Sequence, residues 1–332
     1  MKRILALGGA GFIGSYVVRK LLESGHEVVV VDNFEKYGTL EHDFFSHPHC
    51  NVIRKDVRTM YPAEFRNFDV VLCLAALIGG IRYFHKIPYR IARDNSEILA
   101  HAIDATLAAA PEATFVYFSS SMVYERMQRP VTEEDARLQP VPLTNYGMQK
   151  LYGEYLVRGA HEEMGLRYLT LRPFNAVGSG ELPDVDSGGR VEFGMAHVVP
   201  DFCYKALLRQ TPFEIFGDGE QVRTFTHARD IADALDLLIA QNVENDDFNI
   251  CGDATMKMSD LARLIWTRVT PGLPFPSVRT MDVPPSDVRF RIGRSEKLAA
   301  RLGWKPKHGI DFIIDDTYRY IERTMKLPIG QT

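Results

Sequence analysis

The stretch LGGAGFIGS, at residues 7–15, decides the fold of this chain. The apolar run at residues 4–7 leads into it and predicts a short buried strand. Residues 16–23 follow it with the apolar spacing of a helix, which ends at Gly25. A strand, a glycine-rich turn and a helix in this order form the setting that a dinucleotide-binding fingerprint requires.

Each glycine of the turn has its own physical reason. Gly8 permits the tight turn out of the strand, Gly11 lets the backbone approach a pyrophosphate, and Gly14 lets the helix pack against the strand. The helix N-terminus offers unpaired N–H groups to the phosphates. A second strand, at residues 27–31, leads into Asp32, whose carboxylate can accept hydrogen bonds from ribose hydroxyls and would repel a 2′-phosphate. The sequence therefore predicts a dinucleotide site that prefers NAD over NADP.

The composition excludes several classes of function. The 332 residues, 45% hydrophobic and 25% charged, are typical of a globular protein with a core large enough for two lobes. The net charge of −4, without a basic run, provides no electrostatic footprint for nucleic acid. The longest apolar run, at residues 70–81, is too short to span a bilayer. We therefore expect neither nucleic acid nor a membrane as a partner.

The positions of cysteine and histidine argue against a metal site. Cys50, Cys73, Cys203 and Cys251 are scattered without metal-binding spacing and without the pattern of a disulfide framework, which indicates a reducing compartment. Three histidines between residues 42 and 49 lack the carboxylates or cysteines that would complete a metal site. The chain enters its first strand at once, which leaves no room for a signal peptide and predicts a cytoplasmic location.

Strands and helices alternate over the first 172 residues. This alternation predicts an α/β fold, a doubly wound parallel sheet of the Rossmann type. A helix is expected from Thr144 or Asn145, either of which can cap it, to about Gly165. The other predicted elements are strands at 51–54, 69–76, 113–118 and 167–171 and a helix at 91–110.

The remainder of the chain predicts a smaller mixed lobe that binds the substrate. A helix at 228–240 and a strand at 247–250 return to the sheet, and Ser259 and Ser295 are expected to cap two further helices. The glycine-rich residues 177–194 are expected to form a mobile loop, and the proline-rich residues 271–285 a linker. The predicted domains are an NAD-binding domain of residues 1–174 with 222–252, and a substrate lobe of residues 175–221 with 253–332.

Small and polar residues follow several predicted strands at the edge where open α/β sheets bind ligands. Asp56 and Val57 are expected near the adenine, and the small pair at 75–76 suits close approach to a cofactor. A glycine loop at residues 79–80 follows the predicted strand at 69–76, and a serine cluster at 119–121 follows the one at 113–118. Both lie at the same edge of the sheet.

The order of these features is similar to that in a known family. The fingerprint at residues 8–14, the strand-end serines and Tyr146-x-x-x-Lys150 resemble the extended short-chain dehydrogenase/reductases, specifically the NAD-dependent nucleotide-sugar epimerases and dehydratases such as the UDP-glucose/UDP-galactose 4-epimerases. Nearly the whole chain takes part in the resemblance. Later matches are RPFN at 172–175, FGDG at 216–219, Arg223, and LGWKP at 302–306.

The resemblance implies a catalytic set of Ser120, Tyr146 and Lys150. Tyr146 would be the base, although a free tyrosine has a pKa of about 10. The Lys150 ammonium and the positive nicotinamide ring would favour the phenolate, and Lys150 would also hold the nicotinamide ribose. The family's serine or threonine lies four residues before a Val-Tyr tyrosine, so Tyr124 selects Ser120, whose hydroxyl would bond the reacting oxygen.

The resemblance also implies two sets of binding residues. The expected cofactor set is Gly8, Gly11, Phe12, Ile13, Gly14, Asp32, Asn33, Asp56, Val57, Leu74, Ala75, Ala76, Asn95, Tyr146, Lys150 and Pro173. The expected nucleotide-sugar set is Gly79, Gly80, Ser121, Met122, Asn175, His197, Val198, Phe216, Arg223, Asp287 and Arg289. The resemblance implies that Phe216 stacks on a pyrimidine and that Arg223 contacts ribose or phosphate. Neither contact decides whether the nucleotide is UDP, GDP, CDP or dTDP.

Departures from the family pattern bear on the reaction. Sugar 4,6-dehydratases carry Asp-Glu where this chain has Ser121 and Met122, which disfavours dehydration. GDP-mannose 3,5-epimerases and GDP-fucose synthases carry a cysteine at the position of Met122, yet the glycine loop at 79–80 resembles theirs, and His197 resembles the acid of GDP-fucose synthase.

A third departure concerns the diphosphate. UDP-galactose 4-epimerases usually carry an arginine three residues before the aspartate that matches Asp287, where this chain has Pro284. Arg289 or Arg291 is expected to replace that arginine.

We therefore expect an enzyme that holds NAD tightly and epimerises a nucleotide-diphosphate sugar at C4 through a transient 4-keto intermediate. The alternatives are a nucleotide-sugar 4-dehydrogenase or 4-keto reductase that uses His197, a 3,5-epimerase of the same family, and a non-catalytic dinucleotide-binding protein. The resemblance further implies a homodimer built from the Tyr146 helix and the helix at 91–110. An apolar stripe of Leu99, Ile103 and Leu107 could serve this interface or face the sheet.

Overall fold

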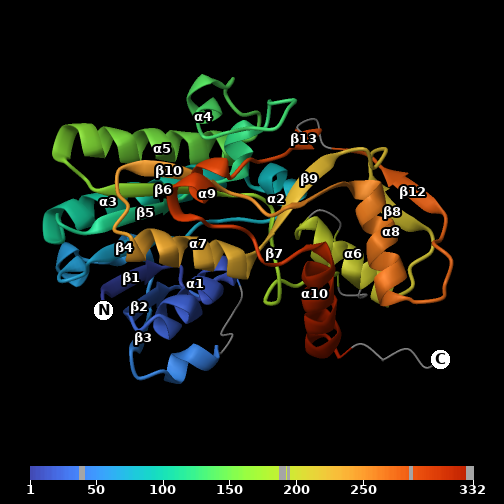
Figure 1. Cartoon of the computed structure of the whole chain (residues 1–332), viewed down its shortest axis with the longest axis horizontal. Coiled ribbons are helices and arrows are strands. Elements are labelled where there is room, and N and C mark those ends of the chain that lie inside the picture. The colour runs from blue at the N-terminus through green and yellow to red at the C-terminus, as the bar shows by residue number, and fades with distance from the viewer. Residues whose placement is uncertain (37–41, 187–191, 193–194, 284–286, 327–332) are drawn as a thin grey trace.

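A seven-stranded parallel sheet forms the larger part of the molecule (Figure 1). The computed structural model describes residues 1–36, 42–186, 192, 195–283 and 287–326. The sheet has the order β10-β6-β5-β4-β1-β2-β3, and every neighbouring pair is parallel. This confirms the predicted doubly wound sheet. Its strands are β1 (Arg3–Leu7), β2 (Glu27–Asp32), β3 (Cys50–Arg54), β4 (Val70–Cys73), β5 (Thr114–Phe118), β6 (Tyr168–Pro173) and β10 (Asp246–Ile250).

Helices cover both faces of this sheet, which is why its central strands are apolar throughout. In Figure 1, α1 (Phe12–Glu23) and α7 (Ala228–Ala240) lie on one side, and α3 (Pro88–Ala109) and α5 (Asn145–Met164) on the other. Each pair of helices seals its own hydrophobic core. Leu99, Ile103 and Leu107 pack into the core beneath α3, so the predicted apolar stripe faces the sheet.

The helix that carries Tyr146 begins and ends as its sequence predicts. The Thr144 hydroxyl accepts a hydrogen bond from the Gly147 amide at 2.9 Å and so caps the N-terminus of α5. Gly165 ends the helix with a φ of 74°, a left-handed conformation that favours glycine. The strand predicted at 69–76 is shorter, because β4 ends at Cys73 and the chain then leaves the sheet.

The smaller lobe is built around β9 (Val222–His227). This strand pairs with β7 (Ala176–Val177), β11 (Ala254–Lys257) and β13 (Phe290–Arg291). Helices α6 (Val198–Leu207), α8 (Met258–Val269) and α10 (Ile310–Thr324) share a third hydrophobic core. Short connections are α2 (Ile81–Lys86), α4 (Asp135–Leu138) and 3-10 turns at Asp43–Ser46, Val57–Thr59, Pro62–Phe65 and Ser121–Tyr124.

Two sequence predictions about this lobe are wrong. The segment expected as a proline-rich linker contains β12 (Val278–Met281), which pairs with β8 (Phe213–Phe216). The prolines that precede β12 favoured a linker in the sequence analysis, although the residues after them form a strand. Ser259 does not cap α8, because the helix already begins at Met258 and the Ser259 amide donates to the Gly219 carbonyl.

Ser295 does stand at the N-cap of α9 (Glu296–Leu302), and Gly303 ends that helix with a φ of 68°. The Ser295 hydroxyl, however, donates to the Cys251 carbonyl at 3.3 Å rather than capping the helix.

The domain boundaries stay a prediction. The strand pairing and the cores show which sheet each boundary segment joins. The segment 222–252 begins with β9, which pairs within the small sheet, and reaches the large sheet only with α7 and β10. Leu298 and Trp304, assigned to the substrate lobe, pack into the core beneath α1 and α7.

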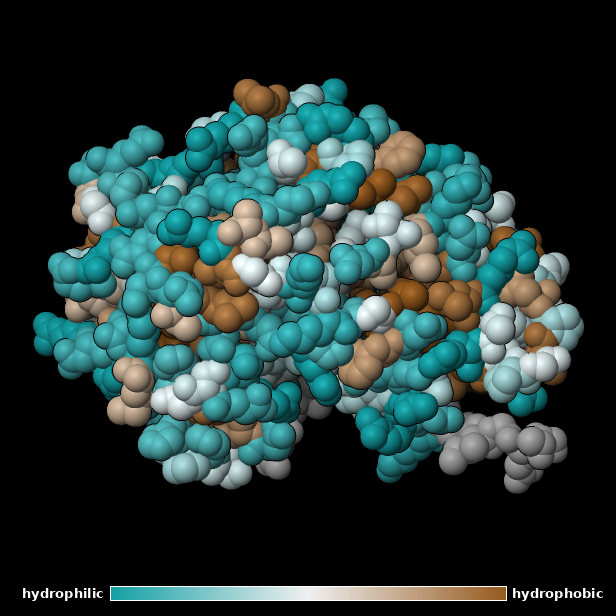
Figure 2. Space-filling model, in the orientation of Figure 1, coloured by the Kyte–Doolittle hydropathy of each residue, from teal (hydrophilic) through white to brown (hydrophobic). Residues whose placement is uncertain are grey.

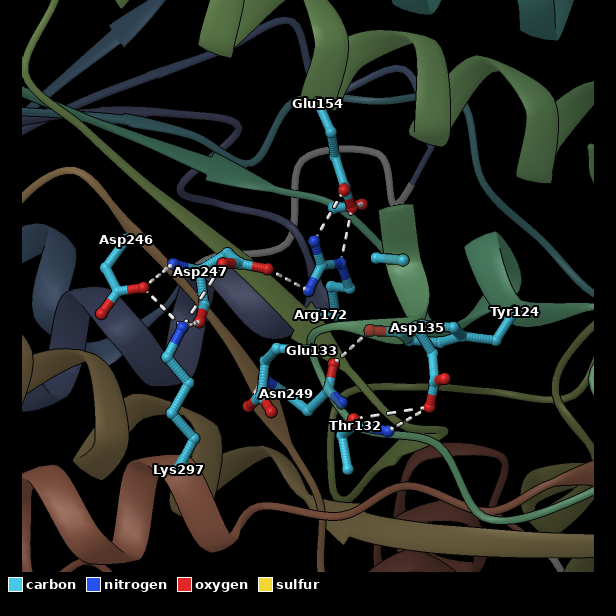
Figure 3. A network of polar contacts seen from close by, with 12 residues as sticks. Tyr124, Thr132, Glu133, Asp135, Glu154, Arg172, Asp246, Asp247, Asn249 and Lys297 are labelled. Carbon is cyan, nitrogen blue, oxygen red and sulfur yellow. Dashed lines mark hydrogen bonds and ion pairs between the residues drawn. The ribbon is translucent and has the colours of Figure 1, made fainter. Parts of the chain in front are cut away.

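A buried polar network fastens the edge strand β10 to the rest of the sheet (Figure 3). Arg172 of β6 donates from Nε and Nη2 to the two carboxylate oxygens of Glu154 on α5, each at 2.7 Å, and Nη1 lies 2.6 Å from Asp247 Oδ2 on β10. The side chains of Arg172 and Glu154 are both completely buried. Glu154 also accepts from the Ser119 hydroxyl at 2.6 Å, so the network ties α5 to the serine cluster after β5.

The surface is mostly hydrophilic on the face shown in Figure 2, with hydrophobic residues gathered in small groups. Within the described part of the chain, no helix combines the length and apolar character needed to cross a bilayer. Among the same residues, no group of three or more histidine, cysteine, aspartate or glutamate side chains is arranged to hold a metal ion.

Candidate active site

A cavity of about 620 Å³ opens where the carboxyl ends of the large sheet meet the smaller lobe. Its lining includes the glycine turn, the ends of β2, β4, β5 and β6, and residues of α6, β8, β9 and β13. Two of the predicted binding residues, Asn95 and Arg289, do not line this cavity; the other predicted cofactor and substrate residues do.

The glycine turn forms a cradle that has no room for side chains. A Cβ on Gly8 would lie 2.5 Å from the Ala75 amide nitrogen, and Gly8 has a φ of 81°. A Cβ on Gly14 would overlap the Gly8 carbonyl oxygen. No side chain caps the N-terminus of α1 at Gly11, so its first amide groups are open to an anion.

Asp32 is held rigidly at the end of β2. Its carboxylate accepts from the Phe34 amide at 2.8 Å and the Ala10 amide at 3.1 Å. Asp56 also lines the cavity, but its carboxylate binds the Arg58 guanidinium, whose hydrogen bonds lower the pKa of Asp56.

Asn95 has a different position from the one expected. Its side-chain oxygen accepts from the Leu77 amide at 2.7 Å, and its amide group donates to the Leu77 carbonyl at 3.2 Å. Asn95 is therefore buried on α3 and supports the loop after β4, which itself lines the cavity.

The three predicted catalytic side chains come together at one edge of the cavity. Ser120 begins the 3-10 turn after β5, and its hydroxyl acts on the side chain of Tyr146, from the first turn of α5, to lower the pKa of that tyrosine. The ring of Tyr146 stacks on Phe84, with centroids 4.4 Å apart and planes within 7°. Lys150, one turn along α5, donates to the Phe118 carbonyl at 2.8 Å, and its Nζ lies 5.8 Å from the Tyr146 ring centroid.

Burial dominates the electrostatics of these groups. Burial raises the pKa of Tyr146 above its ordinary value, whereas the Ser120 hydrogen bond and the positive charge of Arg291 lower it. Burial lowers the pKa of Lys150 to about 8. In the chain alone, the positive charge of Arg291 therefore acts to lower the pKa of Tyr146. The effect of the Lys150 ammonium on the tyrosine stays a prediction.

A histidine and a carboxylate face each other on the smaller-lobe side of the cavity. His197 lines the cavity, and its Nδ1 makes a short contact with Oε1 of Glu181. The Glu181 side chain is buried, while the His197 side chain is 34% exposed. The Gly80 amide donates to the Met195 carbonyl at 2.6 Å, so the loop before His197 is tied to the glycine loop.

Two arginines on neighbouring strands also line the cavity. Arg223 of β9 and Arg291 of β13 are register partners, and Arg223 Nη2 lies 3.6 Å from Asp287 Oδ1. Arg289 instead forms an ion pair with Asp218 at 2.7 Å on the surface, because it precedes β13 and reaches the turn after β8. The expectation for Arg289 is therefore wrong in its placement, and Pro284 lies outside the described residues.

Comparison with known proteins now places the chain. Residues 4–251 match the family model described as the NAD dependent epimerase/dehydratase family. The chain belongs to this family. The UDP-glucose 4-epimerase of Lacticaseibacillus casei is 30% identical over 343 residues, covering 96% of each chain.

Among solved structures, the UDP-glucuronic acid 4-epimerase of Bacillus cereus, in complex with UDP-glucuronic acid and NAD, has a TM-score of 0.84 at 25% identity. It covers 97% of this chain and 99% of its own. The Thermotoga maritima UDP-glucose 4-epimerase, solved with UDP-glucose, has a TM-score of 0.81 at 26% identity, with the same coverage.

NAD is the cofactor of this epimerase/dehydratase family, and the residues of this chain fit it. The crowded glycine cradle leaves the backbone exposed to a pyrophosphate, and the uncapped N-terminus of α1 favours its negative charge. The Asp32 carboxylate at the end of β2 suits ribose hydroxyls and disfavours a 2′-phosphate.

Sequence reasoning missed two neighbours of the site in this family member. Phe84, which stacks on Tyr146, belongs to the short helix α2, which no strong periodicity announced. Glu181, which orients His197, lies within the glycine-rich segment that was expected to be only a mobile loop. Neither contact has a local sequence signal, because each depends on loop packing.

Proposed function

We propose that this chain is a nucleotide-sugar 4-epimerase, with UDP as its nucleotide, acting through bound NAD and a transient 4-keto sugar. One observation carries the proposal: Ser120, Tyr146 and Lys150 meet at the edge of a cavity that adjoins the glycine cradle. Ser121 and Met122 give no second acid–base pair beside Ser120. The names of the relatives support UDP as the nucleotide.

The proposed chemistry begins with a proton transfer. The Tyr146 phenolate takes the proton of the sugar C4 hydroxyl, and the Ser120 hydroxyl stabilises the oxygen as it becomes a carbonyl. NAD, when bound, supplies the acceptor for the C4 hydride and returns it. Tyr146 gives its proton back after the keto sugar has turned its other face, so no net oxidation occurs.

Positive charge makes the phenolate accessible in spite of burial. With a pKa of about 8, Lys150 carries its charge at neutral pH, and it lies one helical turn from Tyr146. The charge of Arg291 acts in the same direction, lowering the pKa of the tyrosine. Two cations at a buried site are the means by which a tyrosine becomes a base near neutral pH.

We assign binding roles by the same reasoning. The proposed cofactor residues are the predicted set without Asn95, and the proposed nucleotide-sugar residues are the predicted set with Arg291 in place of Arg289. We assign the cofactor to the lobe of the large sheet and the nucleotide sugar chiefly to the smaller lobe.

The contact between His197 and Glu181 favours a second candidate function. A histidine oriented by a buried carboxylate is a suitable acid or base, and its ring lines the cavity. Such a group would serve a 3,5-epimerase, which removes carbon-bound protons next to the 4-keto group, or a 4-keto reductase.

One experiment separates these reactions. The purified protein receives UDP-glucose, UDP-N-acetylglucosamine or UDP-glucuronic acid in D₂O without added cofactor, and NMR follows each sugar carbon. We expect the C4 epimer without solvent deuterium, because the hydride returns to the carbon that lost it. Deuterium at C3 or C5 would support a 3,5-epimerase, and a requirement for stoichiometric NAD or NADPH would support a dehydrogenase or reductase.

We also propose a homodimer that uses the outer face of α5. Met148, Tyr152 and Tyr155 follow one another at helical spacing, and all three side chains are exposed. Burying them against a second copy would remove this apolar stripe from water. Sedimentation should give a dimer, and a monomer at micromolar concentration would contradict the proposal.

Four free cysteines support a cytoplasmic location.

A further inference from the structure

Arg291 is a cation in the cavity that lacks an acidic partner. Its Nη1 lies 2.6 Å from the Met122 sulfur, a weak acceptor, and its Nη2 donates to the Asn175 side-chain oxygen. Its Nε is buried and has no hydrogen-bond partner. Among the described residues, no carboxylate comes within 4.0 Å of its guanidinium, whereas Arg223 on the neighbouring strand has Asp287 at 3.6 Å.

Two carboxylates, Glu125 and Asp287, act on the charge of Arg291, but both have other hydrogen-bond partners. Glu125 accepts from the Leu143 amide at 2.6 Å, the Thr144 amide at 2.8 Å and the Thr144 hydroxyl. Asp287 accepts from Gln221 at 2.9 Å and lies beside Arg223. A guanidinium without an anionic partner at a buried position is costly, so this site is suited to an anion that arrives with the ligand.

The supporting contacts hold Arg291 in place. The Asn175 amide group donates to the Thr224 carbonyl at 2.7 Å, which directs its oxygen toward Arg291. Met122 belongs to the 3-10 turn that Ser120 begins, and its amide donates to the Ser120 hydroxyl at 3.2 Å. Arg291 therefore lies at the end of the cavity where Ser120 and Tyr146 are found. It contacts Met122, and its positive charge acts on Tyr146.

Burial lowers the pKa of Arg291 to about 10, so it keeps its positive charge at neutral pH. The planar fork of a guanidinium matches a carboxylate with two hydrogen bonds, which a neutral hydroxymethyl group cannot use in the same way. On a hexose, the groups next to the reacting C4 hydroxyl are the C3 hydroxyl and the C6 group carried by C5, and of these only the C6 group can be a carboxylate.

We propose that Arg291 binds a carboxylate at C6 of the sugar, so that the preferred substrate of the proposed 4-epimerase is a nucleotide-diphospho-hexuronic acid. This inference rests on the proposed function for the identity of the reacting carbon. Arg223, which lies on the side of Asp287 and Gln221, remains the residue assigned to the ribose or the diphosphate.

The test measures binding by calorimetry to the NAD-supplemented protein, with UDP-glucuronic acid, UDP-glucose and UDP as probes. We expect the wild type to bind UDP-glucuronic acid at least about 10-fold more tightly than UDP-glucose. Arg291→Met should weaken UDP-glucuronic acid by about 10- to 100-fold and leave UDP-glucose and UDP within about threefold.

The matched control is Arg289→Met, the same change two residues earlier, at an arginine that pairs with Asp218 on the surface. It should leave all three affinities unchanged. Arg291→Lys keeps the charge, and partial recovery of the uronate preference there would support a direct charge contact. If Arg291→Met fails to fold, the wild-type comparison of the two sugars together with Arg291→Lys decides the question.

Equal wild-type affinities for the two sugars would overturn the inference. An equal loss for all three probes in Arg291→Met would also overturn it, because Arg291 would then hold the diphosphate that they share. A uronate preference that depends on Arg291, without any C4 epimer in the NMR assay, would support the carboxylate site and contradict the proposed reaction.

Discussion

Arg172→Met is expected to destabilise the fold far more than Arg268→Met, although the two arginines make the same contact. Each donates from Nε and Nη2 to a carboxylate at 2.7 Å and 2.7 Å, Arg172 to Glu154 and Arg268 to Asp315. The first pair, drawn in Figure 3, has both side chains at 0% exposure, whereas the Arg268 side chain is 43% exposed. The two contacts differ in burial, and Arg172 also has Asp247 at 2.6 Å, whereas the second carboxylate near Arg268, that of Asp311, is 3.7 Å away.

The expected magnitudes follow from that burial. Removing Arg172 takes both close hydrogen bonds from the buried Glu154 carboxylate and leaves only the more distant Arg158 guanidinium at 3.7 Å, which costs about 3–5 kcal/mol. Removing Arg268 is expected to change the stability little, because water replaces the partner of an exposed pair. A chain of 332 residues has an unfolding entropy of about 0.7 kcal/mol/K, so the buried change lowers the Tm by about 4–7 °C.

The assay is urea and thermal unfolding of the two variants, at equal protein concentration and without ligands. A double variant, Arg172→Met with Glu154→Leu, removes both charges and should recover most of the loss, since replacing a whole buried pair by apolar groups is often nearly neutral. The reasoning would be refuted by an Arg172→Met variant no less stable than Arg268→Met, or by a double variant less stable than Arg172→Met.

Three further results are expected. Tyr146→Phe should lower turnover by about 10²- to 10⁴-fold with nucleotide-sugar binding retained, while the exposed Tyr152→Phe on the same helix should leave turnover unchanged. Gly8→Ala should abolish NAD binding in calorimetry, because its Cβ would lie 2.5 Å from a backbone nitrogen, whereas Gly25→Ala, at the same φ of 81° but with open space, should retain it. Because burial lowers the pKa of Lys150 from 10.5 to about 8, the unfolded state binds more protons between these values; the wild type should therefore gain stability relative to Lys150→Met as the pH rises from 8 to 10.5, which urea midpoints at each pH will show.

Features that depend on neighbouring residues were readable from the sequence. The glycine turn, Asp32 at the end of β2 and the Tyr146–Lys150 spacing all act over one turn or one strand, so their geometry follows from the local fold. The parallel sheet followed from alternating strands and helices for the same reason.

Features that depend on distant pairing were not readable. Arg289 and Arg291 lie two residues apart, and only the pairing of β13 with β9 and the position of Asp218 decide which one reaches the cavity. Asn95 is buried because the Leu77 backbone needs partners, which no helical pattern reveals. The contact between Glu181 and His197 likewise depends on how a loop packs.

The position of β10 has a consequence for how the chain is made and for how it can be rebuilt. This edge strand pairs with β6, yet residues 174–245, which include much of the smaller lobe, lie between them in the sequence. A nascent chain that has not reached residue 246 therefore exposes the open edge of β6, a site for mispairing with other chains. For the same reason, the smaller lobe cannot be exchanged as one contiguous cassette. Its two segments must be transferred together, on both sides of the strand that closes the sheet.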